Sequence, residues 1–229
     1  MSIDKEKYEA LLTELKGRAQ LVAVSKTKPV EDLQALYELG QWDFGENYVQ
    51  ELVDKQTLLP SDIRWHFIGH LQSNKVKYIA PFVHLIHGVD SSRLLKEIDK
   101  QAARNGRNIS CLLQVHIARE ETKFGLDEAE LAEVMKVVAA EASSSGTGEL
   151  RNVNVCGLMG MASFTEDPDK VRSEFHTLKS LFDRYFLSAV APPATPPILS
   201  MGMSGDYRIA VEEGSNMVRI GSLLFGKRG

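Results

Sequence analysis

The chain of 229 residues is 43% hydrophobic and 25% charged, a composition typical of a globular protein rather than of a disordered, collagen-like or membrane-spanning one. Its 27 basic and 31 acidic residues give a net charge of −4 with no long basic block, so nucleic acid is not an expected partner. Cys111 and Cys156 are expected to be buried free thiols, and the charged N-terminus and the lack of a long apolar run predict a soluble protein of the cytoplasm without membrane contact.

Short apolar runs bounded by turn signals are predicted to be strands at 21–25, 42–45, 64–68, 83–88, 110–117, 153–159, 197–201 and 217–221. Helical patterns separate them at 30–39, 47–58, 73–80, 91–105, 127–142, 168–187 and 205–213, and a further helix precedes the first strand. This alternation indicates parallel strands joined by right-handed crossovers. We therefore predict an α/β fold, a single (β/α)8 TIM-type barrel with an extra N-terminal helix, formed as one domain by residues 1–229; a doubly wound open sheet is the alternative.

A barrel of this type builds its sites at the C-terminal ends of the strands. The segments 141–152 and 191–198 lead from helices into strands, so we expect them on the opposite face as exposed connectors. The segments that leave strands hold most of the unusual polar residues. One of these residues, Lys123, could add positive charge near a site, although a solvated lysine is the simpler interpretation.

The last two strands are followed by the components of a phosphate site. In SMGMSGDYRIAVEEG, Ser204 is predicted to cap the N-terminus of a helix that Gly214 ends, and such an N-terminus attracts anions. In RIGSLLFG, Gly221 allows a ligand to approach the backbone closely, and Ser222 adds a hydroxyl. Each segment alone could be an ordinary capped helix or a tight turn, but their joint occurrence favours a phosphate.

Two cationic residues are poorly placed for a solvated surface. Strand alternation puts Arg219 on the face of Met217 and Gly221, opposite Val218 and Ile220, and one of these two faces looks into the barrel. An arginine in the barrel interior needs either a carboxylate or a ligand atom. Lys26 ends the run LVAVSK beside the core, and a neutral lysine there could attack a carbonyl; a lysine that extends out to solvent is the alternative. Lys28 is expected to be more exposed. A lysine, a phosphate cradle and a buried arginine together match the aldehyde, phosphate and ring nitrogen of pyridoxal 5'-phosphate.

The motifs AVSKTKP, FGENYVQE, WHFIGHLQSNK, GLMGMASF and LSMGMSGDYRIAVEEGSNMVRIGSLLFG occur in this order across nearly the whole chain. In this respect the sequence resembles the pyridoxal phosphate homeostasis protein family. The resemblance implies an alanine racemase-like barrel that holds pyridoxal 5'-phosphate, a form of vitamin B6, as an internal aldimine. It implies that Lys26 is the Schiff base lysine, that Ser204, Gly221 and Ser222 hold the phosphate, that Arg219 faces the ring nitrogen, and that Asn47 lies beside the cofactor. The family usually has threonine where this chain has Ser222, which keeps the hydroxyl.

Other interpretations of single residues stay open at this point. Asn47 could instead cap a helix together with Gln50. His66 and His70 could in principle bind a metal, but no set of acidic residues with ligand spacing accompanies them, and the histidines of HLIH, at 84 and 87, should point to opposite faces of a strand. We therefore expect no metal site.

The resemblance implies a protein that binds and carries pyridoxal phosphate within the cell, with little or no catalysis, and that passes the cofactor to apoenzymes. The alternative is a racemase-like enzyme. Racemisation needs an acid or base on each face of the substrate, and the racemases with this barrel take one of these groups from a second domain, for which this sequence leaves no room. For the same reason we expect a monomer. A phosphosugar-type barrel enzyme would leave Lys26 and Arg219 unexplained.

Overall fold

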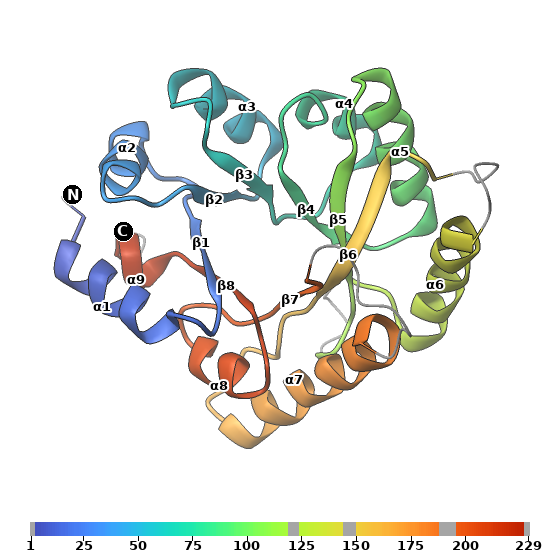
Figure 1. Ribbon diagram of the computed structural model, residues 1–229. Coiled ribbons are helices and arrows are strands. Elements are labelled where there is room, and N and C mark those ends of the chain that lie inside the picture. The colour runs from blue at the N-terminus through green and yellow to red at the C-terminus, as the bar shows by residue number, and fades with distance from the viewer. Residues whose placement is uncertain (1–2, 119–123, 144–149, 188–195, 227–229) are drawn as a thin grey trace.

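The computed structural model describes residues 3–118, 124–143, 150–187 and 196–226. Lys123, residues 144–149 of the first predicted connector and residues 191–195 of the second lie outside these ranges. Within them the chain forms a closed barrel of eight parallel strands in sequence order, with β1 also paired to β8, surrounded by helices (Figure 1). Closure of the ring confirms the predicted barrel and excludes the open sheet.

The strands are β1 (Gln20–Val24), β2 (Asp43–Glu46), β3 (Arg64–Phe67), β4 (Leu85–Val89), β5 (Ile109–Gln114), β6 (Val153–Met159), β7 (Ile198–Ser200) and β8 (Met217–Ile220). The α-helices are α1 (Lys5–Leu15), α2 (Val30–Glu38), α3 (Val49–Leu58), α4 (Val76–Ile79), α5 (Ser92–Arg104), α6 (Glu128–Ser143), α7 (Pro168–Phe182), α8 (Tyr207–Glu212) and α9 (Ser222–Phe225). A 3-10 turn, Ser73–Lys75, precedes α4, and a π-helical turn, Asp183–Leu187, follows α7.

Each predicted strand is found, and the differences are at the ends. The predicted strand 110–117 stops at Gln114, because the chain turns away and Val115 makes only an isolated bridge to Leu126. The predicted helix 168–187 is α-helical only as far as Phe182 before it widens into the π-turn. The short helix α9 was not predicted; it begins directly after Gly221.

The alternation of each strand sorts its side chains into two layers. One set packs outward under the helices and forms the main core, with Phe44, Trp65 and Phe67 among its largest members. The other set fills the inside of the barrel with Val22, Leu85, Leu112, Met159 and Met217. This inner layer also contains polar residues, which are described below.

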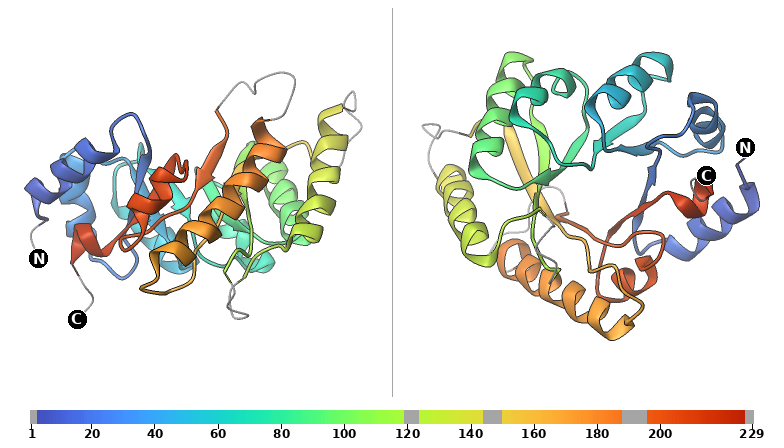
Figure 2. Two further views of the ribbon diagram at one scale, coloured as in Figure 1. Left: turned by 90° about the horizontal axis from the view of Figure 1, so that it is seen from below. Right: turned by 180° about the vertical axis from the view of Figure 1, so that it is seen from behind.

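The two ends of the described chain meet on the outside of the barrel, where α1 and α9 lie side by side (Figure 1). Helix α1 is capped by Asp4, which accepts a hydrogen bond from the Lys7 N–H at 3.1 Å, and it buries Tyr8, Leu11 and Leu15. Figure 2 shows the ring of helices from two further directions, with α7 lying along the outside of the barrel next to α8. Among the described residues, no helix is both long and apolar enough to span a membrane.

Both cysteines are free, as predicted: Cys111 is buried and Cys156 is half-buried. The Cys156 Sγ lies 3.5 Å from the Cys111 carbonyl oxygen. Burial raises the pKa of the Cys111 thiol well above its usual value and that of Cys156 to about 11. Both thiols are therefore protonated and unreactive at neutral pH.

Candidate functional site

A cavity of about 430 Å³ opens at the carboxyl ends of the strands. Its wall is built from the segments that follow β1, β2, β3, β6 and β7, together with β8 and the segment that follows it. The fold brings all six candidate residues to this wall: Lys26, Asn47, Ser204, Arg219, Gly221 and Ser222. Residues separated by nearly 200 positions in the sequence therefore line one site.

The position of Lys26 is set by its two neighbours in the chain. The Ser25 hydroxyl donates to Glu46 Oε1 at 2.6 Å, and the Thr27 N–H donates to Glu51 Oε1 at 2.5 Å. Thr27 has a positive φ of 63°, which a β-branched residue adopts only when its surroundings enforce it. The turn that carries Lys26 is thus held on both sides by carboxylates.

A buried lysine joins these two carboxylates. The Lys55 ammonium, on α3, donates to the Ser25 carbonyl at 2.8 Å, to Glu46 Oε1 at 2.8 Å and to Glu51 Oε1 at 2.6 Å. Burial raises the pKa of Glu46 even though Lys55 and Ser25 act in the opposite direction. We call Ser25, Glu46, Glu51 and Lys55 the outer network, because it lies between the barrel and α3; it fixes the turn that presents Lys26.

Lys28 is half-buried, like Lys26, and both residues line the cavity. The Lys28 ammonium donates to the Phe225 carbonyl at the end of α9, at 3.0 Å. This hydrogen bond holds the Lys28 side chain against the protein surface, and it connects α9 to the segment that follows β1.

Arg219 lies inside the barrel, on the same face of β8 as Met217, and is only 4% exposed. Its guanidinium donates to the Ser200 carbonyl at 2.8 Å, to Ser200 Oγ at 2.6 Å and to the Gly160 carbonyl at 3.0 Å. None of the described carboxylates forms an ion pair with it, and Asp206 acts on it only through space. Burial lowers the pKa of Arg219 to about 10, so the side chain is still cationic at neutral pH.

The loops after β7 and β8 meet at Ser204 and Gly221. Ser204 does not cap α8 as predicted, because the helix begins three residues later and Asp206 turns back to accept the Met203 N–H at 2.6 Å. Ser204 Oγ instead accepts the Gly221 N–H at 3.3 Å and so joins the two loops. A Cβ at Gly221 would lie 3.0 Å from the Val24 carbonyl oxygen, so only glycine allows this approach without displacement.

Asn47 does not cap a helix either, because α3 begins at Val49 without a side-chain cap and the Gln50 amide donates to Asp54 at 2.8 Å instead. The Asn47 Oδ1 atom is buried and has no hydrogen-bond partner among the described residues. An unsatisfied buried acceptor costs about 1–3 kcal/mol. This unpaired oxygen beside the cavity therefore favours a ligand that brings a donor.

The residues behind Arg219 were not predicted from the sequence. Arg219, Ser200, His87, His66 and Asp43 form a buried hydrogen-bonded chain, which we call the interior relay. They lie on β8, β7, β4, β3 and β2, and no periodicity in the sequence shows which residues meet across a barrel.

The candidate metal ligands do not gather as a pair. His70 Nδ1 donates to Asp90 Oδ2 at 3.0 Å and its ring stacks on Phe124, so it does not share the surroundings of His66. His66 does meet His84 and Asp43, which places three possible ligand atoms within 4.8 Å of one another. However, Asp43 is already paired with the Arg64 guanidinium, whose positive charge opposes a second cation.

Comparison with known proteins places this arrangement in a wider group. Residues 4–229 match the family model of the alanine racemase N-terminal domain. The chain is 42% identical over 214 residues to the pyridoxal phosphate homeostasis protein of Aquifex aeolicus, covering 92% of this chain and 87% of that protein. It is 37% identical over 219 residues to the human pyridoxal phosphate homeostasis protein, covering 91% of this chain and 76% of that protein.

Solved structures show the same barrel. The structure of PipY from Synechococcus elongatus with pyridoxal phosphate bound is 34% identical and matches with a TM-score of 0.83, covering 97% of this chain and 99% of that chain. An alanine racemase from Bartonella henselae is 15% identical with a TM-score of 0.69, covering 97% of this chain and 59% of that one. This second likeness concerns the fold alone.

Proposed function

Because the chain belongs to the pyridoxal phosphate homeostasis proteins, within the alanine racemase N-terminal domain family, we propose that it binds pyridoxal 5'-phosphate in the cavity at the carboxyl ends of the strands and serves the homeostasis of this cofactor. Residues 1–229 act as one cofactor-binding unit. The observation that carries the proposal is that a lysine, a buried guanidinium and a hydroxyl-rich loop pair line the same cavity.

The donors of the cavity fit the chemistry of this cofactor. When bound, pyridoxal phosphate supplies an aldehyde that reacts reversibly with an amine, together with an electron-withdrawing ring. Lys26 offers the amine, the hydroxyls of Ser204 and Ser222 offer donors to a phosphate, and Gly221 lets that phosphate come close to the backbone. Arg219 offers N–H groups to the ring nitrogen. The orphaned Asn47 Oδ1 beside the cavity is an acceptor that a donor group on the ligand would satisfy.

The same wall supports carriage rather than catalysis. Among the described residues that line the cavity there is no tyrosine, histidine or cysteine. A racemase needs an acid or base on each face of its substrate, and Lys26 can serve only one of them. We propose that the protein holds the cofactor as a monomer in the cytoplasm and passes it to apoenzymes that require it.

A direct test is to mix the purified protein with pyridoxal phosphate, reduce with borohydride and map the modified peptide by mass. Wild type should turn yellow and carry the reduced cofactor on Lys26. Lys26→Ala should lose this adduct, whereas Lys28→Ala, a control on the same cavity wall, should keep it. A wild-type protein with no adduct, or an adduct that moves to Lys28 only, would contradict the assignment.

Carriage and racemisation are separated by exchange of the α-hydrogen of an amino acid. The loaded protein is incubated with L-alanine in heavy water, and deuterium in the amino acid is measured by mass. We expect incorporation no faster than with free pyridoxal phosphate. Incorporation that depends on Lys26 and exceeds this background would favour the racemase alternative.

A further inference from the structure

The interior relay crosses the barrel from the cavity to the opposite end. Arg219 Nη1 lies 2.6 Å from Ser200 Oγ, which lies 3.2 Å from His87 Nδ1. His87 Nε2 lies 2.9 Å from His66 Nδ1, and His66 Nε2 lies 2.9 Å from Asp43 Oδ1. Asp43 is the first residue of β2, so the relay ends at the N-terminal side of the strands. None of its five residues is more than 4% exposed.

The two ends of the relay fix the direction of every hydrogen bond in it. A guanidinium can only donate, so Ser200 Oγ accepts from Arg219. An ionised carboxylate can only accept, so His66 Nε2 carries the proton that points to Asp43. With both imidazoles neutral, His66 Nδ1 then accepts from His87 Nε2–H, and His87 Nδ1 in turn accepts the Ser200 O–H. Both histidines are thereby set in the Nε2–H tautomer.

This direction also compensates the buried charge of Arg219. Each side chain between Arg219 and Asp43 turns its acceptor atom towards the arginine and its donor O–H or N–H towards Asp43, so the local dipoles are aligned with the cation, and hydrogen bonds in series polarise one another. A carboxylate in direct contact would also neutralise the charge of Arg219. However, a bidentate ion pair would use two of the guanidinium N–H groups that could otherwise bind a ligand. Three of its five N–H groups are engaged by the described residues, which leaves two for a ligand.

We propose that Ser200, His87, His66 and Asp43 are positioning residues for Arg219: they hold its guanidinium against the ends of β6 and β7 and compensate its charge from a distance, so that two N–H groups stay available to the ring nitrogen of the ligand. The nature of that ligand rests on the proposed function. The relay itself does not, because its tautomers are a property of the protein alone.

The first test uses the protein without cofactor. Nitrogen NMR of histidine-labelled protein should show His66 and His87 protonated at Nε2 and bare at Nδ1. Ser200→Ala removes the donor to His87 Nδ1 and should change the signals of His87. If either histidine carries its proton on Nδ1, the direction of the relay is wrong and the proposal is overturned.

The second test reads the ring nitrogen of bound pyridoxal phosphate that is labelled with nitrogen-15 at this atom. Ser200→Ala should shift the resonance and weaken cofactor binding by about fivefold to tenfold, the loss of roughly one hydrogen bond. Asp43→Asn, at the far end, should shift the resonance in the same direction by less. These effects are expected without loss of the adduct on Lys26.

A matched control separates positioning from simple structural damage. Ser215 is also a buried serine between β7 and β8, and its hydroxyl bonds to the carbonyls of Leu199, Met201 and Met217 rather than to the relay. Ser215→Ala should lower stability but leave the ring-nitrogen resonance unchanged. Equal shifts in both serine variants, or a shift in neither, would overturn the proposal. If wild type binds no cofactor while the tautomers are as expected, the proposed function fails and the relay stands without this ligand.

Discussion

Lys55 and Arg219 are both buried cations within reach of the same cavity wall, but their surroundings differ. Lys55, with a side chain 6% exposed, lies outside the barrel and spends its three N–H groups on two carboxylates and a carbonyl. Arg219 lies inside, touches only neutral acceptors and has two N–H groups left among the described contacts. All three N–H groups of Lys55 are therefore used in hydrogen bonds, whereas two of the five in Arg219 are not used by the described residues.

This difference separates a structural cation from one that is available to a ligand. A saturated ion pair fixes geometry, and in the outer network it fixes the turn of Lys26. A cation such as Arg219, whose charge is compensated through the interior relay, still has N–H groups that can donate to a ligand. Burial alone does not distinguish a structural cation from a ligand-binding one, because both Lys55 and Arg219 are buried. The number of N–H groups without a protein partner does distinguish them.

The largest expected effect is the loss of Lys55. Lys55→Met keeps the length of the side chain but leaves Glu46 buried without its partner, which should lower the free energy of unfolding by about 3–5 kcal/mol. The measurement is urea unfolding followed by circular dichroism. Adding Glu46→Gln removes the stranded charge and should recover part of the loss. A single variant that loses less than about 1 kcal/mol would show that the outer network is not a structural clamp.

Arg219→Met should show the reverse pattern, a smaller loss of stability and a larger loss of binding. Removing the cation ends three hydrogen bonds to neutral acceptors, with an expected cost of about 1–3 kcal/mol in unfolding. The affinity for pyridoxal phosphate should fall about 10-fold to 100-fold, because a charged donor to the ring is lost. Unchanged affinity, measured by titration of the absorbance, would remove Arg219 from the binding site.

The sequence predicted the barrel well, because short apolar runs and turn residues report locally which segments are strands. Alternation groups Arg219 with Met217 on one face of β8, but only the closed barrel shows that this face is the inner one. Partners could not be predicted in this way, since Ser25 and Lys55 are 30 residues apart and meet only after β1, β2 and α3 have packed. His87 and Ser200 are 113 residues apart.

The errors at single residues have a common physical cause, which is competition between similar groups for one position. Ser204 is a good helix cap by residue type, but Asp206 lies nearer the start of α8 and makes the local turn. Lys28 follows the strand and precedes a proline, yet the carbonyl of Phe225 lies within reach and keeps it half-buried. Residue type alone does not settle these positions: at α8 the competing residue is only two positions from Ser204, and for Lys28 the partner carbonyl lies 197 residues away in the sequence.

The two networks should respond to acid in opposite directions. Burial raises the pKa of Glu46 above 4.5, so the folded protein takes up a proton more readily than the unfolded chain, and stability from this group rises as the pH falls towards 4.5. Burial opposes ionisation of Asp43, but hydrogen bonds from His66 and Arg64 outweigh it and hold its pKa below 3.8. The stability from Asp43 is therefore present above pH 3.8 and is lost as the pH falls through the folded value.

The measurement is the free energy of unfolding at a series of pH values for wild type, Glu46→Gln and Asp43→Asn. The first variant should flatten the curve above pH 4.5, and the second should flatten it below pH 3.8. If both variants changed the same part of the curve, the opposite environments inferred for the two carboxyls would be wrong.

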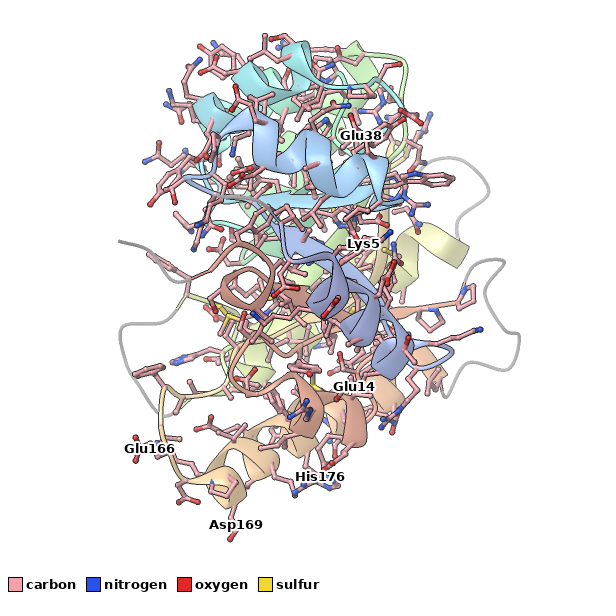
Figure 3. All side chains as sticks on the ribbon, turned by 90° about the vertical axis from the view of Figure 1, so that its left-hand side faces the viewer. Lys5, Glu14, Glu38, Glu166, Asp169 and His176 are labelled. Atoms are coloured by element: carbon pink, nitrogen blue, oxygen red, sulfur yellow. The ribbon has the colours of Figure 1, made fainter. Side chains whose placement is uncertain are left out.

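The smallest effect on the free energy of unfolding is expected at Arg172. This variant tests whether Lys55 is important because it is buried or because it has two carboxylate partners. Arg172 also pairs with two carboxylates, Glu212 at 2.6 Å and Glu213 at 2.8 Å, but its side chain is 44% exposed. It belongs to α7, from whose outer face His176 projects in Figure 3. Because solvent screens such a pair and both partners stay hydrated when it is broken, Arg172→Gln should leave the free energy of unfolding unchanged within error. A loss as large as that of Lys55→Met would mean that the count of carboxylate partners, rather than burial, sets the strength of these cations.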